Sequence, residues 1–184
     1  MAALVLGAIT QMSDRTPWLA AILADRLRRR ALVLAAAALA LGVNYAMGVV
    51  AGMAVAALII PEAKLLLLAL ALVLAGVGTA WRDKAPDRLE GWRIGAAATS
   101  FLGLFIMAFG DRMQFIAAAL AARSDLPWAA AVGATLGAWG VNVVAVMLGE
   151  RGWTALPLRW IRLAAAVLLV VIGVVLALNA LRLV

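Results

Sequence analysis

The chain has 184 residues, of which 67% are hydrophobic and 14% are charged, and its formal net charge is +7. About one-quarter of the residues of a soluble domain are charged, so this composition indicates an integral membrane protein. The sequence has no cysteine and no histidine, which excludes thiolate and imidazole metal sites and Ser-His-Asp catalysis. Because the basic residues lie in short loops between apolar runs, we expect the lipid bilayer as a partner. We expect no nucleic-acid partner and no enzymatic activity.

Six apolar runs predict six membrane-spanning helices. Crossing about 30 Å of hydrocarbon takes roughly 20 helical residues. The predicted spans cover residues 2–24, 32–57, 63–81, 94–122, 128–148 and 160–181. The predicted fold class is therefore all-α, with a single transmembrane domain over residues 1–184 and a polar loop at residues 82–93.

Lysine and arginine are unevenly divided between the two sides of this topology. The positive-inside rule places the richer side in the cytoplasm, and with it the polar loop, so that both termini lie outside. The richer side holds Arg26, Arg28, Arg29, Arg30, Arg82, Lys84, Arg88, Arg93, Arg151, Arg159 and Arg162, and the other side holds Lys64, Arg123 and Arg182. Tryptophans near the predicted span ends suit an interfacial aromatic belt; they are Trp81, Trp92, Trp128, Trp153 and Trp160.

The chain contains an internal repeat. The pair Asp14-Arg15 recurs 97 residues later as Asp111-Arg112. With one inserted residue, Gly42-Val43-Asn44 also matches Gly140-Val141-Asn142. The halves, residues 1–81 and 94–184, each hold three predicted spans, and an odd number inverts the second half relative to the first. Inverted repeats are typical of secondary transporters, whose substrate site lies near the midplane where the repeats meet.

The two aspartates are the strongest candidates for a functional site, because charged side chains inside a membrane are costly and usually functional. Gln11 and Gln114 lie within one helical turn of Asp14 and Asp111 respectively. Pro17 lacks an N–H and would free the carbonyl of Ser13 from its helical bond. Such oxygen donors suit hard divalent cations. Asn44 and Asn142 could add amide oxygens from the second and fifth predicted spans.

Purely structural interpretations of these residues stay open. The aspartates could form neutral pairs with Arg15 and Arg112 that lock the helices together, within or across the two stretches. Asn44 and Asn142 could hydrogen-bond between helices. Glycines spaced four apart predict close helix packing; they are Gly48 and Gly52, and Gly133 and Gly137. The arginines at 28–30 predict topology or contact with anionic lipids.

The two stretches resemble the motif of a known family. The Golgi-type Ca²⁺/Mn²⁺–proton antiporters and their bacterial manganese-exporter relatives carry Glu-x-Gly-Asp-(Lys/Arg)-(Thr/Ser) in each of two inverted three-helix halves. Gln11-Met12-Ser13-Asp14-Arg15-Thr16 and Ala108-Phe109-Gly110-Asp111-Arg112-Met113 occupy these places here. Gln11 and Ala108 stand where the family has glutamates, so two of its four motif carboxylates remain.

The resemblance implies secondary transport of Mn²⁺ or Ca²⁺ or both, in exchange for protons, in the bacterial plasma (inner) membrane. The ion would bind at Asp14 and Asp111 with support from Gln11, Thr16 and Gln114, while Arg15 and Arg112 would balance charge or gate. No tightly bound cofactor is expected beside the transported ion. Two alternatives stay open: the same fold could carry another small solute, or the protein could be a non-transporting membrane protein whose cation site has been dismantled.

Overall fold

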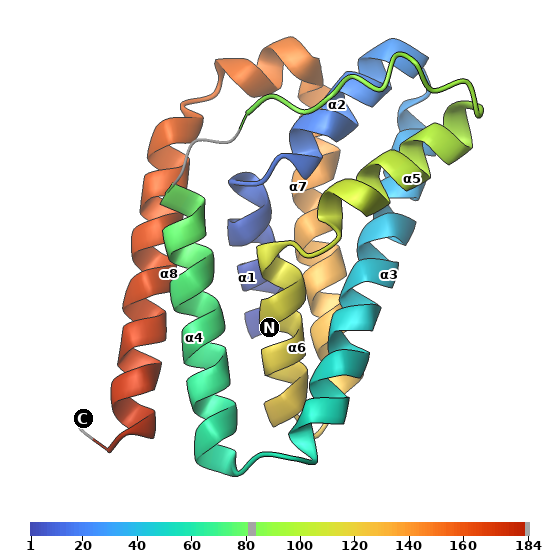
Figure 1. Cartoon of the computed structure of the whole chain (residues 1–184). Coiled ribbons are helices and arrows are strands. Elements are labelled where there is room, and N and C mark those ends of the chain that lie inside the picture. Colours follow the sequence, from blue (N-terminus) through green and yellow to red (C-terminus); the bar gives the residue numbers. More distant parts are fainter. Residues whose placement is uncertain (81–83, 183–184) are drawn as a thin grey trace.

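The computed structural model describes residues 1–80 and 84–182, and all regular secondary structure in these ranges is helical. The predicted all-α class is thus confirmed for the described part of the chain (Figure 1). The helices are α1 (Ala2–Met12), α2 (Thr16–Leu27), α3 (Arg30–Ala56), α4 (Pro61–Ala80), α5 (Ala96–Ala108), α6 (Arg112–Arg123), α7 (Pro127–Ala155) and α8 (Leu158–Ala180).

Four helices within the described ranges, α3, α4, α7 and α8, are long and apolar enough to cross a membrane. The pair α5 and α6 passes the same test together but is bent by 68°, so it is either a broken span or a re-entrant loop. Helix α1 is apolar and shorter. The structure therefore supports a membrane protein with four or five candidate spans in its described part.

The first and fourth predicted spans are not continuous helices, and both are interrupted at an aspartate. Helix α1 ends at Met12 and α2 begins at Thr16, and Pro17 in the first turn of α2 has no N–H with which to continue α1. The second break holds Gly110 in a left-handed conformation, with φ +73°. Asp111 then caps α6 by accepting a 2.7 Å hydrogen bond from the backbone N–H of Gln114.

The helices of one half pack mainly on those of the other. Helices α1 and α2 lie against α7, α5 and α6 lie against α3, and α4 lies against α8. Figure 1 shows α1 below α2 and α6 below α5. Glycine makes these contacts close, as the spacing predicts: a Cβ at Gly137 would overlap the carbonyl of Leu4, and one at Gly52 would overlap that of Ala118.

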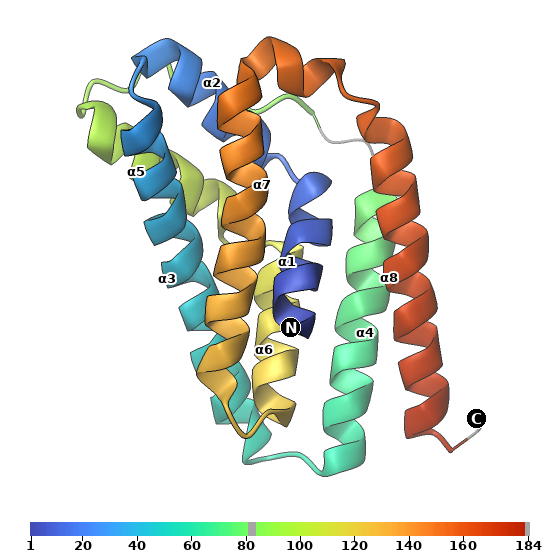
Figure 2. The same cartoon turned by 180° about the vertical axis from the view of Figure 1, so that it is seen from behind.

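Helices α4 and α8 contact each other through equivalent surfaces. A Cβ at Gly76 of α4 would lie 2.8 Å from the carbonyl oxygen of Ala166, and one at Gly173 of α8 would lie 2.8 Å from that of Ala69. Gly76 and Ala69 precede Gly173 and Ala166 by the same repeat distance. The contact is therefore reciprocal, and the two helices run side by side and antiparallel at one edge of the molecule (Figures 1 and 2).

The connections predicted to be basic gather at one end of the molecule. The α2–α3 and α7–α8 junctions lie at the upper end of Figure 1, opposite the α3–α4 and α6–α7 turns and the C-terminus. At this upper end α7 continues past the predicted limit of the fifth span, through a kink at Gly149 with φ +70°. Asp25 at the end of α2 accepts a 2.8 Å hydrogen bond from the N–H of Glu150 beside the kink.

The tryptophans expected in an aromatic belt differ in exposure. Trp128 and Trp160 have 52% and 66% of their surface exposed, as residues of an interface would. Trp153 is only 3% exposed and belongs to a core cluster with Ala21, so its place in the belt was a wrong prediction. It is buried because α7 bends at Gly149 and turns its last segment back over the helices. The predictions for Trp81 and Arg82 fall outside the described residues.

Candidate cation site

The two helix breaks face a single buried tyrosine on α3. The Tyr45 hydroxyl lies 3.3 Å from Oδ2 of Asp111 and 3.4 Å from Oε1 of Gln11. Tyr45 is fully buried and Gln11 is 1% exposed. A phenol has one proton, so it can donate to only one of these oxygens at a time. Tyr45 therefore links the end of α1 to the break before α6.

Asp14 is paired across the halves, with the arginine of the other stretch. Its Oδ2 accepts a 2.6 Å hydrogen bond from the Thr16 hydroxyl, and its Oδ1 lies 3.6 Å from Nη2 of Arg112. The side chains of Asp14 and Arg112 are 15% and 21% exposed. This is the crosswise form of the two pairings that the sequence left open. Asp111 itself lies in an extended conformation before α6 and accepts a hydrogen bond from the N–H of Gln114.

Arg112 also reaches helix α4. Its Nη1 donates a 2.7 Å hydrogen bond to the Thr79 hydroxyl, which is fully buried near the end of α4. The Thr79 hydroxyl in turn donates to the carbonyl of Ala75 at 2.7 Å. One guanidinium therefore contacts the first break and α4 while its own backbone begins α6.

Gln114 and Asn44 fasten the second break to α3. The Gln114 amide oxygen accepts a 2.7 Å hydrogen bond from the N–H of Gly110, and its amide nitrogen donates to the carbonyl of Asn44 at 3.1 Å. The Asn44 amide nitrogen donates to the carbonyls of Ala40 and Phe105 at 2.9 and 3.2 Å. Gln114 therefore supports the site by fixing the backbone next to Asp111. Its amide oxygen already accepts the hydrogen bond from Gly110.

Several buried polar atoms of predicted site residues have no hydrogen-bond partner in the described part of the chain. They are Nε2 of Gln11 and the side-chain oxygens of Asn44 and Asn142. Asn142 only donates to the carbonyl of Ala138 on its own helix, at 2.9 Å. A buried polar atom without a partner is costly and usually has a functional or structural reason. The two asparagine oxygens thus remain available as acceptors.

The remaining predicted residues lie around the first break. Ser13 is buried, and its hydroxyl donates to the carbonyl of Thr10 at 2.8 Å. Arg15 is exposed and immediately precedes α2. The structure therefore brings Gln11, Asp14 and Asp111 together and adds two residues that the sequence reasoning missed, Tyr45 and Thr79. Tyr45 is the one tyrosine of the chain and lies in the middle of a predicted span. Tyrosine is usually found near the membrane interfaces, so this position could have identified Tyr45 as a candidate site residue.

The charge of the site is low for a divalent cation. No group of three or more Asp, Glu, His or Cys residues lies close enough to hold a metal within residues 1–80 and 84–182. Two carboxylates face one guanidinium, together with hydroxyl and amide oxygens. Oxygen donors of this kind suit a hard cation.

Comparison with known proteins identifies the family. The model of the family described as "Divalent cation/proton antiporter GDT1" matches residues 1–87 and 96–183, which include both aspartate stretches. The chain belongs to this antiporter family. A Vibrio cholerae protein named "Putative manganese exporter" is 31% identical over 165 residues, which cover 86% of this chain and 80% of that protein. No solved structure matches the chain significantly.

Membership of the antiporter family confirms the resemblance drawn from the two stretches. Gln11 and Ala108 are therefore substitutions at positions where the family motif has glutamate. Gln11 is the last residue but one of α1, and Ala108 is the last residue of α5 and fully buried. Both glutamate positions of the motif therefore lie at the ends of the helices that lead into the breaks.

Proposed function

We propose that this antiporter-family member moves divalent cations, Mn²⁺ or Ca²⁺, out of the cell in exchange for protons. The observation that carries the proposal is the meeting of Asp14 and Asp111, from breaks in two different spans, around Tyr45 and Arg112. The name of the Vibrio relative supports Mn²⁺ as a substrate. Asp14 and Asp111 bind the ion and also take up the exchanged protons, with Gln11 and Thr16 supplying further oxygens.

The transporter is built from six spans in two inverted repeats. In this proposal the first span is α1 with α2 and the fourth is α5 with α6. The equivalent positions of the two breaks and the reciprocal contact of α4 with α8 support it. The protein lies in the bacterial plasma membrane with the basic end in the cytoplasm and both termini outside, as the positive-inside rule predicts.

Arg112 balances the charge of the site when no ion is bound. Its guanidinium lies near the Asp14 carboxylate, which is only partly accessible to water. A buried carboxylate without a counter-charge is costly. An arriving cation replaces Arg112 as the partner of Asp14, so that binding and displacement of the guanidinium occur together. Arg15 has the equivalent place in the first half and is more exposed.

The low charge of the site favours one other function. If Arg112 stays paired with Asp14, one carboxylate is left without a counter-charge, which suits a monovalent cation or a small zwitterionic solute better than a divalent cation. The fold would then be the same and the solute different. Transport measurements on defined ions separate the two functions.

The test is flux of Mn²⁺ and Ca²⁺ into proteoliposomes of the purified protein, with and without a pH gradient. We expect flux that the gradient accelerates and that Asp14→Asn or Asp111→Asn abolishes. Asp125→Asn, in the exposed α6–α7 turn, makes the same chemical change away from the site and should transport normally. Absence of flux from folded wild-type protein would refute divalent-cation transport. Flux that persists in both site variants would refute the proposed site.

A further inference from the structure

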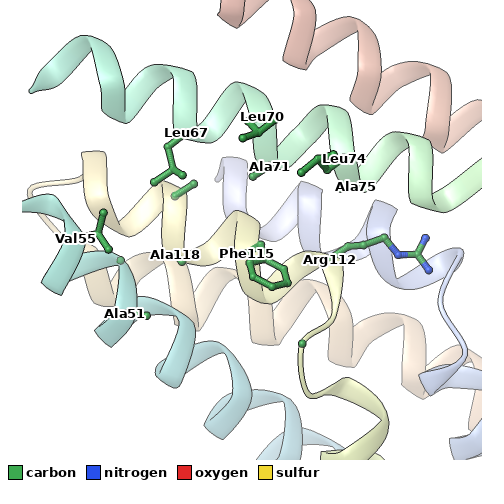
Figure 3. Close-up of a pocket in the computed structure, with 13 residues that line it drawn as sticks. Ala51, Val55, Leu67, Leu70, Ala71, Leu74, Ala75, Arg112, Phe115 and Ala118 are labelled. Atoms are coloured by element: carbon green, nitrogen blue, oxygen red, sulfur yellow. The ribbon is translucent and has the colours of Figure 1, made fainter. Parts of the chain in front are cut away.

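Helices α4 and α8 form a pair whose contact with the other helices is looser than their contact with each other. The pair is joined by the reciprocal fit at Gly76 and Gly173, and its remaining contacts are mainly those of α4 with α6. A cavity of about 470 Å³ lies between α4 and the neighbouring helices α3 and α6 (Figure 3). Apolar side chains line it, and Arg112 stands at one end. Helix α4 therefore contacts α6 and makes little direct contact with α3.

The Arg112 side chain packs against the end of helix α4. The Cδ atom of Arg112 lies 3.7 Å from the place of a Cβ on Gly78, and its Nη1 reaches the Thr79 hydroxyl at 2.7 Å. The proton of that hydroxyl is used on the carbonyl of Ala75. A lone pair of the Thr79 oxygen therefore faces the guanidinium, so Thr79 acts as a hydrogen-bond acceptor for Arg112.

The contacts of the guanidinium with Thr79 and with Asp14 differ in closeness. The 2.7 Å bond to Thr79 has the length of a good hydrogen bond, whereas the 3.6 Å separation from the Asp14 carboxylate is an ion pair beyond hydrogen-bond distance. Of these two side chains, Thr79 is therefore the closer partner of the arginine. If the protein transports cations as proposed, the distance between Arg112 and Asp14 sets how strongly the guanidinium competes with a cation for Asp14.

We propose that Thr79 is a positioning residue that links the α4–α8 pair to the cation site through Arg112. When the pair moves away from α6, Thr79 draws the guanidinium with it and Asp14 is released to the ion. When the pair returns, Arg112 comes back to Asp14. Without the Thr79 hydroxyl, the guanidinium moves closer to Asp14 and competes with the ion. This inference rests on the proposed cation transport, but its effect on Arg112 and α4 exists without transport.

The first test is the Mn²⁺ concentration dependence of flux in Thr79→Val, which keeps the shape and removes the acceptor. We expect the KM to rise about tenfold, the loss expected for a hydrogen bond to a charged group. Thr79→Ser restores the hydroxyl and should stay within about twofold of wild type. Thr135→Val is the matched control, because Thr135 makes the same hydroxyl bond to the carbonyl four residues earlier, on α7.

A double variant tests whether Thr79 acts through Arg112. In an Arg112→Gln background, Thr79→Val should cause no further change in the KM for Mn²⁺.

The second test needs no transport. Because the chain has no cysteine, spin labels can be placed uniquely at Val77 on α4 and Met47 on α3, which are both exposed. We expect Thr79→Val to shift or broaden the distance distribution without ions and Thr79→Ser to leave it unchanged. A wild-type distribution in Thr79→Val overturns the inference. So does an unchanged KM, or Thr79→Ser behaving like Thr79→Val. If wild type moves no Mn²⁺, the proposed function fails. The spin-label distances alone then decide whether Thr79 links α4 to Arg112.

Discussion

Tyr45→Phe is the most informative single change, because it removes one oxygen from the centre of the candidate site and leaves the shape unchanged. The hydroxyl lies between the Asp111 carboxylate and the Gln11 amide oxygen, at a fully buried position on α3, and donates to one of them at a time. A hydrogen bond to a charged group contributes about 1.5–3 kcal/mol. The contacts here are 3.3 and 3.4 Å, longer than the usual O–H···O range. We therefore expect the lower value, about 1.5 kcal/mol, which weakens ion binding roughly tenfold.

The assay is Mn²⁺ flux in proteoliposomes with thermal unfolding of the same preparation. We expect the KM of Tyr45→Phe to rise roughly tenfold while the melting temperature changes little, because the ring still fills its place. Tyr45→Leu, which also loses the ring, should lower the melting temperature as well. A KM within twofold of wild type, or a lower one, in folded Tyr45→Phe would refute the role of the hydroxyl.

Two further predictions follow from the packing and from the motif. Gly52→Ala should destabilise the protein by about 1–3 kcal/mol, because its Cβ would overlap the carbonyl of Ala118, whereas Gly140→Ala meets nothing within 4 Å and should be neutral. Equal unfolding midpoints for the two variants would contradict the close α3–α6 contact. Gln11→Glu with Ala108→Glu restores the four motif carboxylates and should tighten Mn²⁺ binding about tenfold or more. Calorimetry that shows no gain in the folded double variant would contradict the account of the weakened site.

The apolar runs made the all-helical class predictable, and the internal repeat pointed to a contact between the two aspartate stretches. Asp14 and Asp111 recur at equivalent positions, and inverted halves bring such positions together. The same spacing relates Gly76 to Gly173, whose reciprocal contact the structure shows. The helical class and this glycine contact could be predicted because apolar run length and an internal repeat can both be read directly from the sequence.

The partners of the two aspartates could not be predicted in the same way. Tyr45 and Thr79 match Val143 and Leu176 of the second half, so no repeat marks them. Their roles depend on which helices pack together and in what register. The crossed pairing of Arg112 with the first break likewise depends on where the two helices end.

The helix breaks show the limit of hydrophobic patterns. The first and fourth predicted spans are apolar over a length sufficient to cross a membrane, and the hydrophobic pattern predicted each as one span. A proline after Asp14 and a left-handed Gly110 before Asp111 interrupt them instead. Polar caps such as the Asp111 carboxylate then satisfy the freed backbone N–H groups. The length and hydropathy of an apolar run do not predict such local breaks in a helix.

Mn²⁺ binding to the purified protein, followed by electron paramagnetic resonance, tests the central claim most directly. The signal of the free ion disappears when the ion binds, so the affinity is measured without transport. The account predicts one saturable site that Asp14→Asn and Asp111→Asn each weaken at least tenfold and that Asp125→Asn leaves unchanged. Equal affinity in wild type and in both site variants would contradict a cation site between the two helix breaks.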